Sequence, residues 1–285
     1  MLTWWEGARE ERDLLPWRAT RDPWEILVAE TMLAQTPVGR VAARFPKLIE
    51  RFPTAGACAE AAPGDVISMW EGLGYNRRAV LLHRAASVIV VAHGGAVPHS
   101  LHELLALPGV GPYTARAVLA TAFTHEVAVV DTNVGRVLAR AVAGTSLRPA
   151  EAQRLADSLV PGGLGREWNL ALMDFGSLVC RARSPLCDVC DVGRAGCCEW
   201  RLAGSAHDPA PGSAGVTTGQ APFSGSDREG RGRLVDAARR SPVAAADLAS
   251  ATGWPGDPDR ARRVAGGLVA DGILAHAPGG AYRLP

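Results

Sequence analysis

The sequence predicts an all-α fold of two helical lobes followed by a small C-terminal winged-helix-like module. Apolar residues recur at three- and four-residue spacings over residues 24–142 and again over about 149–179, with Gly or Pro breaks between the helical stretches. No convincing strand alternation precedes the C-terminus. Hydrophobic residues make up 47% and charged residues 21% of the 285-residue chain, which is typical of a globular protein.

Composition shifts along the chain predict the domain boundaries. We expect one lobe to combine residues 1–22 with 132–200, and a six-helix lobe to span residues 23–131. Residues 201–226 are rich in Gly, Ser, Pro and Ala, which predicts a flexible linker. Helical patterns over 230–240, 244–252 and 259–271, followed by a terminal hairpin, predict the winged-helix-like module over 227–285.

Charge and targeting signals exclude little. The formal net charge of +1 leaves nucleic-acid binding open, because a binding face needs local rather than overall basic charge. The N-terminus lacks the pattern of an export signal, and the apolar runs are too short to cross a membrane. We therefore expect a cytoplasmic monomer, nucleoid-associated if bacterial. Lys47 is the only lysine, and the other basic residues are arginines.

The first candidate site lies in the helical stretch that begins Pro23-Trp-Glu-Ile. From Ile26 to Gln35 this helix is apolar nearly all round, and Glu30 is its only charged residue. A buried carboxyl group has a raised pKa, which suits a general acid. The alternative is a structural Glu bonded to an arginine.

The second candidate is the string Leu107-Pro-Gly-Val-Gly-Pro-Tyr-Thr between two helical stretches. Gly109 and Gly111 flank Val110, so the backbone can turn tightly there. The amides that begin the next helix, near Thr114, would bind a phosphate of DNA. An ordinary corner between two helices is the alternative, but the complete string favours a DNA-binding hairpin.

The third candidate is Asp131, which follows an apolar lead-in and precedes Thr-Asn-Val-Gly-Arg. This pattern predicts a helix N-cap, and capping alone is the alternative role. An ionised carboxylate there could also stabilise a cationic sugar in a transition state. A raised-pKa acid at Glu30, an ionised Asp131 and a hairpin that grips a duplex together suit cleavage of the N-glycosidic bond of a flipped-out nucleotide.

The fourth candidate is a cluster of cysteines with the spacing Cys180-x6-Cys187-x2-Cys190, followed by the adjacent pair Cys197-Cys198. Without an export signal such a cluster predicts metal binding rather than disulfides. Four thiolates in a short irregular loop suit a [4Fe–4S] cluster, and zinc is the alternative.

Six strings in this order resemble one family. The chain is similar to the endonuclease III superfamily of helix-hairpin-helix DNA glycosylases, and most of all to its adenine glycosylase (MutY) branch, over roughly residues 14–200. The strings are Leu15-Pro-Trp-Arg, Ala29-Glu-Thr-Met-Leu-Ala-Gln-Thr, Gly72-Leu-Gly-Tyr, Leu107-Pro-Gly-Val-Gly, Val130-Asp-Thr-Asn-Val and Leu172-Met-Asp-Phe-Gly.

The resemblance implies catalytic roles. Glu30 would protonate the departing base, and Asp131 would stabilise or trap the sugar cation. Tyr113 and Asn133 would position the sugar and the water. Bifunctional members of the family carry a lysine nucleophile where this chain has Tyr113, and Lys47 is predicted on a surface helix. The resemblance therefore implies a monofunctional enzyme that leaves the abasic site uncut.

The resemblance also implies DNA contacts and a cofactor. Gln35 and Tyr75 would wedge into double-stranded DNA that carries a mismatch or an oxidised guanine. The last cysteine interval of the family has five intervening residues, whereas Cys190 to Cys197 has six. We expect Cys197 to complete the [4Fe–4S] ligand set, with Cys198 as second choice. The expected base pocket comprises Val38, Leu170, Trp24 and Arg18.

The identity of the excised base stays open at this stage. Val38, Gln35 and Gly72-Leu-Gly-Tyr favour adenine opposite guanine or 8-oxoguanine. Leu170 stands where many adenine glycosylases have a polar residue, and its neighbourhood resembles thymine glycosylases that act on G·T mismatches. Thymine or uracil excision is therefore one alternative, and a non-catalytic iron–sulfur DNA-binding regulator is another.

Overall fold

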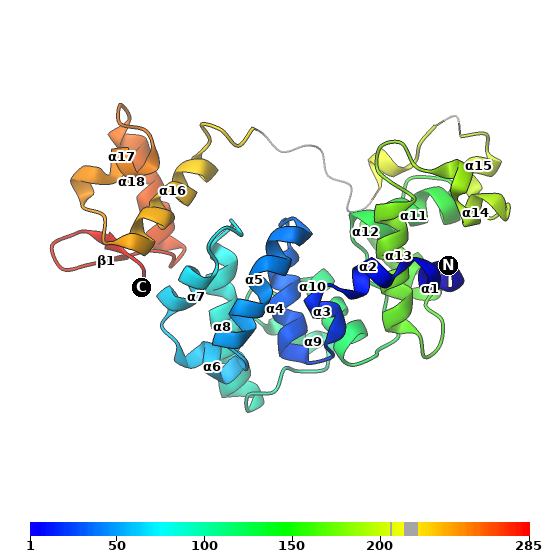
Figure 1. Cartoon of the computed structure of the whole chain (residues 1–285), viewed down its shortest axis with the longest axis horizontal. Coiled ribbons are helices and arrows are strands. Elements are labelled where there is room, and N and C mark those ends of the chain that lie inside the picture. Colours follow the sequence, from blue (N-terminus) through cyan, green and yellow to red (C-terminus); the bar gives the residue numbers. More distant parts are fainter. Residues whose placement is uncertain (206, 214–221) are drawn as a thin grey trace. The chain divides into compact units, whose positions relative to one another are not determined.

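Helices dominate the fold, as the sequence predicts. The computed structural model describes residues 1–205, 207–213 and 222–285. Within this described part, regular strands occur only as a two-stranded antiparallel sheet near the C-terminus (Figure 1). None of the described helices combines the length and the apolar character needed to cross a membrane.

The chain forms two compact units, and several segments contribute to each. The first unit comprises residues 1–26, 99–105 and 110–219, and the second comprises 27–98, 106–109 and 220–285. Helices α4 (Pro23–Leu33) and α9 (Leu101–Ala106) span the points where the chain passes from one unit to the other. The lobe boundaries expected from composition stay a prediction.

The first unit is built around the long helix α13. Its described elements are α1 (Leu2–Ala8), α2 (Glu10–Asp13), α3 (Pro16–Ala19), α10 (Pro112–Ala122), α11 (Thr132–Val137), the π-helical stretch η1 (Leu138–Ala143), α12 (Pro149–Ser158), α13 (Gly165–Leu178), the short 3-10 helix η2 (Cys187–Val189), α14 (Asp191–Arg194), α15 (Glu199–Leu202) and the 3-10 helix η3 (Ala210–Gly212).

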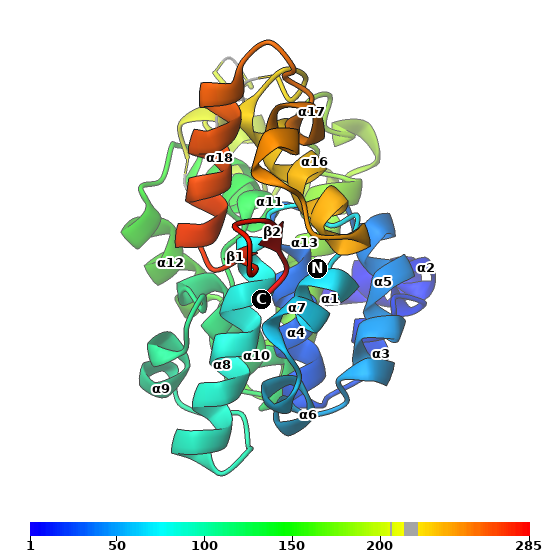
Figure 2. The same cartoon turned by 90° about the vertical axis from the view of Figure 1, so that its left-hand side faces the viewer.

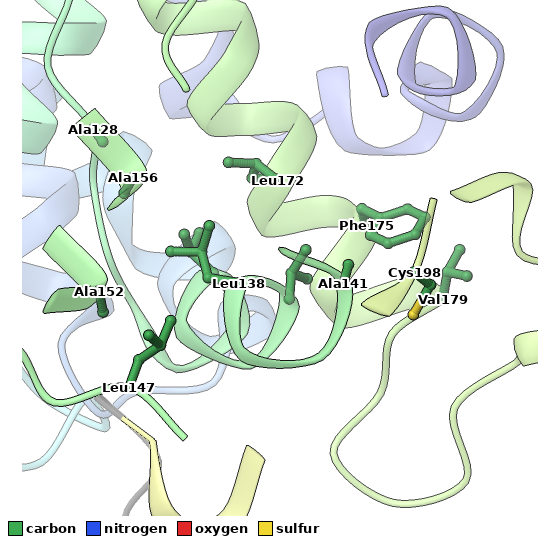
Figure 3. Close-up of a cluster of buried hydrophobic side chains, with 12 residues drawn as sticks. Ala128, Leu138, Ala141, Leu147, Ala152, Ala156, Leu172, Phe175, Val179 and Cys198 are labelled. Carbon is green, nitrogen blue, oxygen red and sulfur yellow. The ribbon is translucent and has the colours of Figure 1, made fainter. Parts of the chain in front are cut away.

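An apolar cluster joins the helices of the first unit to residues 180–198, the cysteine segment. Leu138 from η1 and Leu172 from α13 lie at its centre, and Phe175, Val179 and Cys198 extend it toward the cysteines (Figure 3). Burial of these side chains contributes stability at roughly 25 cal/mol per Å² of apolar surface. The same cluster therefore supports both α11, which begins after Asp131, and the cysteine segment.

The second unit contains a helical lobe that begins with most of α4. Helix α4 is buried, as predicted from its apolar character, and Leu27, Val28 and Met32 are at most 1% exposed. Glu30 is partly exposed as a residue, while its carboxyl oxygen Oε2 is buried, so burial of the predicted acid is confirmed only in part. The other helices of this lobe are α5 (Val38–Arg51), α6 (Ala55–Glu60), α7 (Pro63–Met69) and α8 (Arg77–His93).

The last 60 or so residues add a small module to the second unit (Figure 2). Leu234, Leu248, Leu268 and Ile273 form its buried centre, and Val243 pairs with Tyr282 beside the terminal sheet. The elements are α16 (Asp227–Arg240), the 3-10 helix η4 (Ala245–Asp247), α17 (Leu248–Thr252), α18 (Pro258–Ala270), β1 (Ala275–His276) and β2 (Tyr282–Arg283).

Contacts with the helical lobe hold this module within the second unit. Arg239 of α16 donates from Nη2 to the Ile67 carbonyl at 3.0 Å and to Asn76 Oδ1 at 3.1 Å. The Gly64 amide donates to the Pro285 carbonyl at 2.9 Å. These bonds connect α7 and the start of α8 to the module.

The predicted linker is ordered in part. Residues 207–213 pack on the first unit, where Ala210 and Ser213 are buried. Asp208 forms an ion pair with Arg140 of η1 at 2.5 Å, and the Leu147 amide donates to Ser213 Oγ at 3.1 Å. The rest of the linker prediction includes residues 206 and 214–221, which lie outside the described residues.

Candidate active site and cysteine cavity

Asp131 caps the N-terminus of α11, which confirms the predicted N-cap. Its Oδ1 accepts backbone N–H groups of Asn133 at 2.8 Å and Val134 at 2.7 Å. Its Oδ2 accepts the side-chain amide of Asn133 at 2.8 Å. Burial raises the pKa of Asp131, and these hydrogen bonds act in the opposite direction. The carboxylate is thus desolvated and held in one orientation, as a group that stabilises a developing positive charge needs to be.

Arg136 connects this cap to the first cysteine. Its Nη2 donates to Asn133 Oδ1 at 2.8 Å and to the Gly176 carbonyl at 2.6 Å. Its Nε donates to the Cys180 carbonyl at 2.6 Å. A Cβ atom on Gly176 would lie 2.7 Å from the Asn133 Cβ, so only glycine fits there. A single buried guanidinium therefore couples the orientation of Asn133, and through it Asp131, to the start of the cysteine segment.

Tyr113 lies in the first turn of α10, in the same unit as Asp131. It packs against the buried residues Ala117 and Val129 together with Met173 of α13. Thr114 and Leu170 are partly exposed. Helices α10 and α11 both pack on α13, so the elements that carry Tyr113, Asp131 and Asn133 share one neighbouring helix.

The hairpin between α9 and α10 has the backbone that its glycines predict. Gly109 has a φ of +79°, and a Cβ there would lie 2.7 Å from the Leu81 Cβ, so a side chain is excluded on both counts. Gly111 is the extended N-cap residue of α10. Leu107 and Val110 are buried and Gly109 is exposed, so the side chains of these two predicted DNA-binding residues support the turn rather than face solvent.

Glu30 and the two predicted wedge residues belong to the second unit. Gln35 and Tyr75 are exposed, and both adopt left-handed backbone conformations with φ of +62° and +48°. Non-glycine residues rarely adopt this conformation, which costs of order 1–3 kcal/mol and persists where surrounding contacts compensate for it. The loop after α4, which contains Gln35, and the loop before α8, which contains Tyr75, are therefore each held in a strained backbone conformation.

Arg78 provides those contacts for both loops. Its Nη1 donates to the carbonyls of Thr31, Met32 and Ala34 at 2.6–2.9 Å, and its Nη2 donates to Thr36 Oγ1 at 2.8 Å. Nη2 also donates to the carbonyls of Leu73 and Gly74, at 3.3 and 3.1 Å. The guanidinium stacks 5.6 Å from the ring centroid of Tyr75. Burial lowers the pKa of Arg78 to about 10.

The remaining residues of the predicted base pocket have different environments. Val38 is 39% exposed at the start of α5, whereas Trp24 is buried in α4. Arg18 is held by Asp174 in a two-bond ion pair with distances of 2.7 and 2.8 Å, and its side chain is 8% exposed. Trp5 donates to the same carboxylate at 3.0 Å. In the first unit Arg18 is thus part of a structural network that joins α3 to α13.

Four cysteines line one cavity in the first unit. Cys180, Cys187, Cys190 and Cys198 line it together with Arg140 and Arg201. Cys197, the expected fourth ligand, instead borders a different pocket and is exposed. Across the part of the chain that the structure describes, no three Cys, His, Asp or Glu side chains converge closely enough to grip a single ion.

Arg140 lies beside one of these thiols. Its Nη1 lies 3.7 Å from Cys180 Sγ and donates to the Arg181 carbonyl at 2.6 Å. Asp208 accepts from Nε at 2.9 Å and from Nη2 at 2.5 Å. The guanidinium also stacks over Trp200, 5.0 Å from its ring centroid. A buried positive charge beside a set of thiols suits a site that accumulates negative charge.

Sequence reasoning missed the three arginines that organise these sites, namely Arg78, Arg136 and Arg140. A signal for two of them exists in Val134-Gly-Arg-Val-Leu-Ala-Arg-Ala, where Arg136 and Arg140 are the only charged residues of an apolar helical run. Their four-residue spacing puts both on one helix face. Arg78 follows Arg77 in the sequence, and nothing local distinguishes it.

Comparisons with known proteins agree with this architecture. The HhH-GPD superfamily of base excision DNA repair proteins matches residues 28–161. The chain is 41% identical to the adenine DNA glycosylase of Mycolicibacterium smegmatis, over 100% of this chain and 94% of that protein. A thermostable thymine-DNA glycosylase structure matches with a TM-score of 0.64 and 32% identity, over 71% of this chain and 93% of the other.

A trapped covalent complex of endonuclease III with DNA also matches, with a TM-score of 0.58 and 25% identity, over 65% of this chain and 87% of the other. The helix-hairpin-helix fold expected from the sequence is thereby confirmed. The match to the adenine enzyme extends along the full chain, including the C-terminal module. The chain therefore belongs to the HhH-GPD superfamily of base excision DNA repair proteins, in its adenine DNA glycosylase (MutY) branch.

Proposed function

We propose that this protein is a monofunctional DNA glycosylase that removes adenine paired with guanine or 8-oxoguanine in double-stranded DNA. The observation that carries the proposal is the Asp131 carboxylate, which three hydrogen bonds orient at the start of α11. The full-length similarity to an adenine DNA glycosylase supports adenine as the base. The protein acts as a monomer in the cytoplasm.

In the proposed reaction, Glu30 donates a proton to the departing base as the N-glycosidic bond breaks. Positive charge then develops on the sugar, and Asp131 stabilises it. Asn133 and Tyr113 position the sugar and the attacking water. The oriented hydrogen bonds from Asn133 and Val134 keep the carboxylate from rotating while the charge develops.

The grip on DNA comes from backbone and loop geometry. The amides at the start of α10, freed by the turn at Gly109 and Gly111, bind a phosphate. Gln35 and Tyr75 enter the duplex beside the extruded nucleotide, and their exposure in fixed left-handed conformations supports this role. Arg78 holds both loops in that shape.

The proposed absence of strand-cleaving activity follows from the lysine inventory. Lys47, the only lysine of the chain, is exposed on α5, and Tyr113 stands where bifunctional relatives have a lysine. Borohydride added during turnover traps a Schiff base between a lysine and the sugar. We expect no covalent protein–DNA adduct, and an adduct formed at Lys47 would contradict the monofunctional assignment.

We also propose that the cysteine cavity holds a [4Fe–4S] cluster. The donor set fits the group, because four cysteines and a buried arginine line one cavity. Bound there, the cluster would tie the cysteine segment together through bonds to the thiolates. The Arg136 contact to the Cys180 carbonyl would then keep Asn133 and Asp131 in register with that segment.

A second candidate function is excision of thymine or uracil opposite guanine. Leu170 favours it, since an apolar side chain cannot hydrogen-bond to the edge of adenine. The structural similarity to a thymine-DNA glycosylase also favours it. Duplexes containing A·8-oxoG, A·G, T·G and U·G, treated with alkali after incubation, separate the two. Cleavage at T·G or U·G with both adenine duplexes intact would replace the leading proposal.

The catalytic role of Glu30 is tested by Glu30→Gln. Glu25 lies on the same helix and is also partly exposed, so Glu25→Gln is the matched control. We expect Glu30→Gln to bind an A·8-oxoG duplex while its rate of base release falls by about 10²–10⁴-fold, and Glu25→Gln to retain the wild-type rate. Wild-type protein that binds all four duplexes and releases no base would instead support a non-catalytic regulator.

A further inference from the structure

The adjacent thiols Cys197 and Cys198 have opposite environments. Cys198 is 8% exposed and borders the cavity that Cys180, Cys187 and Cys190 also line. Cys197 is exposed, donates from Sγ to the Ala195 carbonyl at 3.4 Å, and borders a separate pocket near Met1. Only one thiol of the pair therefore faces the cavity.

Backbone geometry explains this division. Gly196 turns the chain with a φ of +68°, and Cys198 is the extended N-cap residue of α15, with φ −110° and ψ 104°. Successive side chains of an extended backbone point to opposite sides. With Cys198 directed inward, Cys197 is directed outward. Exchanging the two would require rotating the start of α15.

Packing holds Cys198 in the inward orientation. Its side chain lies in the apolar cluster beside Val179 and Phe175 (Figure 3). Its Sγ donates to the Arg140 carbonyl at 3.6 Å, so the thiol lies next to the residue whose guanidinium approaches Cys180 Sγ. The thiols of Cys198 and Cys180 thus both lie beside Arg140, which lines the cavity.

We infer that Cys198, and not Cys197, is the fourth thiolate ligand of the metal centre. The ligand spacing is then Cys180-x6-Cys187-x2-Cys190-x7-Cys198. This inference rests on the proposed iron–sulfur cofactor and assigns its last ligand. Arg140, whose guanidinium approaches Cys180 Sγ, and Arg201 border the same cavity.

Serine substitutions test the assignment through metal content rather than activity. We expect Cys197→Ser to retain wild-type iron, acid-labile sulfide and visible absorbance. We expect Cys198→Ser to lose at least half of its iron or to show the electron paramagnetic resonance signal of a three-iron cluster. Cys58 is also buried, in α6 of the second unit, so Cys58→Ser controls for the cost of a buried hydroxyl and should retain its iron.

Alkylation of the intact wild-type holoprotein keeps the assignment testable if Cys198→Ser fails to fold. With iodoacetamide under native conditions, peptide mass spectrometry should find Cys197 modified and Cys198 protected. Loss of iron in Cys197→Ser, or modification of Cys198 with Cys197 protected, would overturn the ligand assignment alone. Wild-type protein purified without iron would overturn the cofactor and the ligand assignment together.

Discussion

Substituting Asp131 by Asn separates the catalytic role of this residue from its structural role. Asn is as good a helix N-cap as Asp, and its Oδ1 can still accept the backbone N–H groups of Asn133 and Val134. The change removes the negative charge and leaves the fold able to form. Capping alone therefore predicts an active variant, and charge stabilisation predicts an inactive one.

The contacts of Asp131 determine how much stability and how much catalytic rate Asp131→Asn should lose. One contact is lost, because the new amide would face the Asn133 side-chain amide across 2.8 Å. A hydrogen bond to a charged group contributes about 1.5–3 kcal/mol, but removing a buried charge offsets part of that cost, as the raised pKa of Asp131 indicates. We expect the free energy of unfolding to fall by about 1–2 kcal/mol. Loss of a preorganised electrostatic stabiliser slows chemistry by about 10²–10³-fold, equivalent to about 2.7–4 kcal/mol.

The assay pairs denaturant unfolding with the single-turnover rate of base release from an A·8-oxoG duplex. Asp157 gives a matched control, because its Oδ1 accepts the Ala128 amide at 3.0 Å and Arg116 Nη1 at 2.7 Å in the same unit. Asp157→Asn should lose comparable stability and keep its rate. An Asp131→Asn variant that retains more than about a third of the wild-type rate would refute the electrostatic role, since it would lie far outside the expected range.

Three further predictions concern pH, the wedge loops and the C-terminal module. Because burial raises the pKa of Asp131, the carboxylate takes up a proton at a higher pH than an ordinary aspartate. The single-turnover rate should therefore begin to decline at a correspondingly higher pH as the pH is lowered. The same decline at low pH in Asp131→Asn would contradict this. Arg78→Met should lower the free energy of unfolding by at least about 3 kcal/mol, the low-end value of two charge-assisted hydrogen bonds. Arg78→Lys should recover only part of that free energy. Denaturant unfolding measures both variants, and full recovery in Arg78→Lys would contradict the role of Arg78 as a donor to several acceptors. Arg239→Ala should increase hydrogen exchange around Ile67 and Asn76, which accept hydrogen bonds from Arg239. Unchanged exchange there would show that the module does not restrain α7 and the start of α8.

Local rules account for the parts of the site that the sequence predicted. The N-cap role of Asp131 depends on residues two and three positions further along, and the positive φ of Gly109 depends on its own missing Cβ. Both can be read from a short string, as can the buried apolar helix around Val28. The order of these strings along the chain then pointed to the family.

Long-range contacts account for what the sequence did not reveal. Arg136 and Arg78 bind carbonyl groups more than 40 residues away in the chain, such as those of Cys180 and Thr31, and backbone carbonyls carry no sequence signature. The partial exposure of Glu30 likewise depends on tertiary packing rather than on the apolar character of its helix.

The environments of the adjacent cysteines and the anchoring of the linker segment also depend on contacts that the sequence does not show. Spacing alone cannot distinguish Cys197 from Cys198, because the choice depends on the direction in which Gly196 turns the chain. Asp208 looked like a linker residue from the composition around it, yet it pairs with a buried arginine 68 positions earlier. Composition averages over a segment and therefore misses a single anchoring ion pair.

The most direct test of the central claim identifies the free base that the wild-type protein releases. An equimolar mixture of A·8-oxoG, A·G, T·G and U·G duplexes is incubated with the protein, and the released bases are separated and identified by mass spectrometry. We predict free adenine, with Glu30→Gln releasing about 10²–10⁴-fold less in the same time. Free thymine or uracil without adenine would contradict the assignment of this chain as an adenine glycosylase.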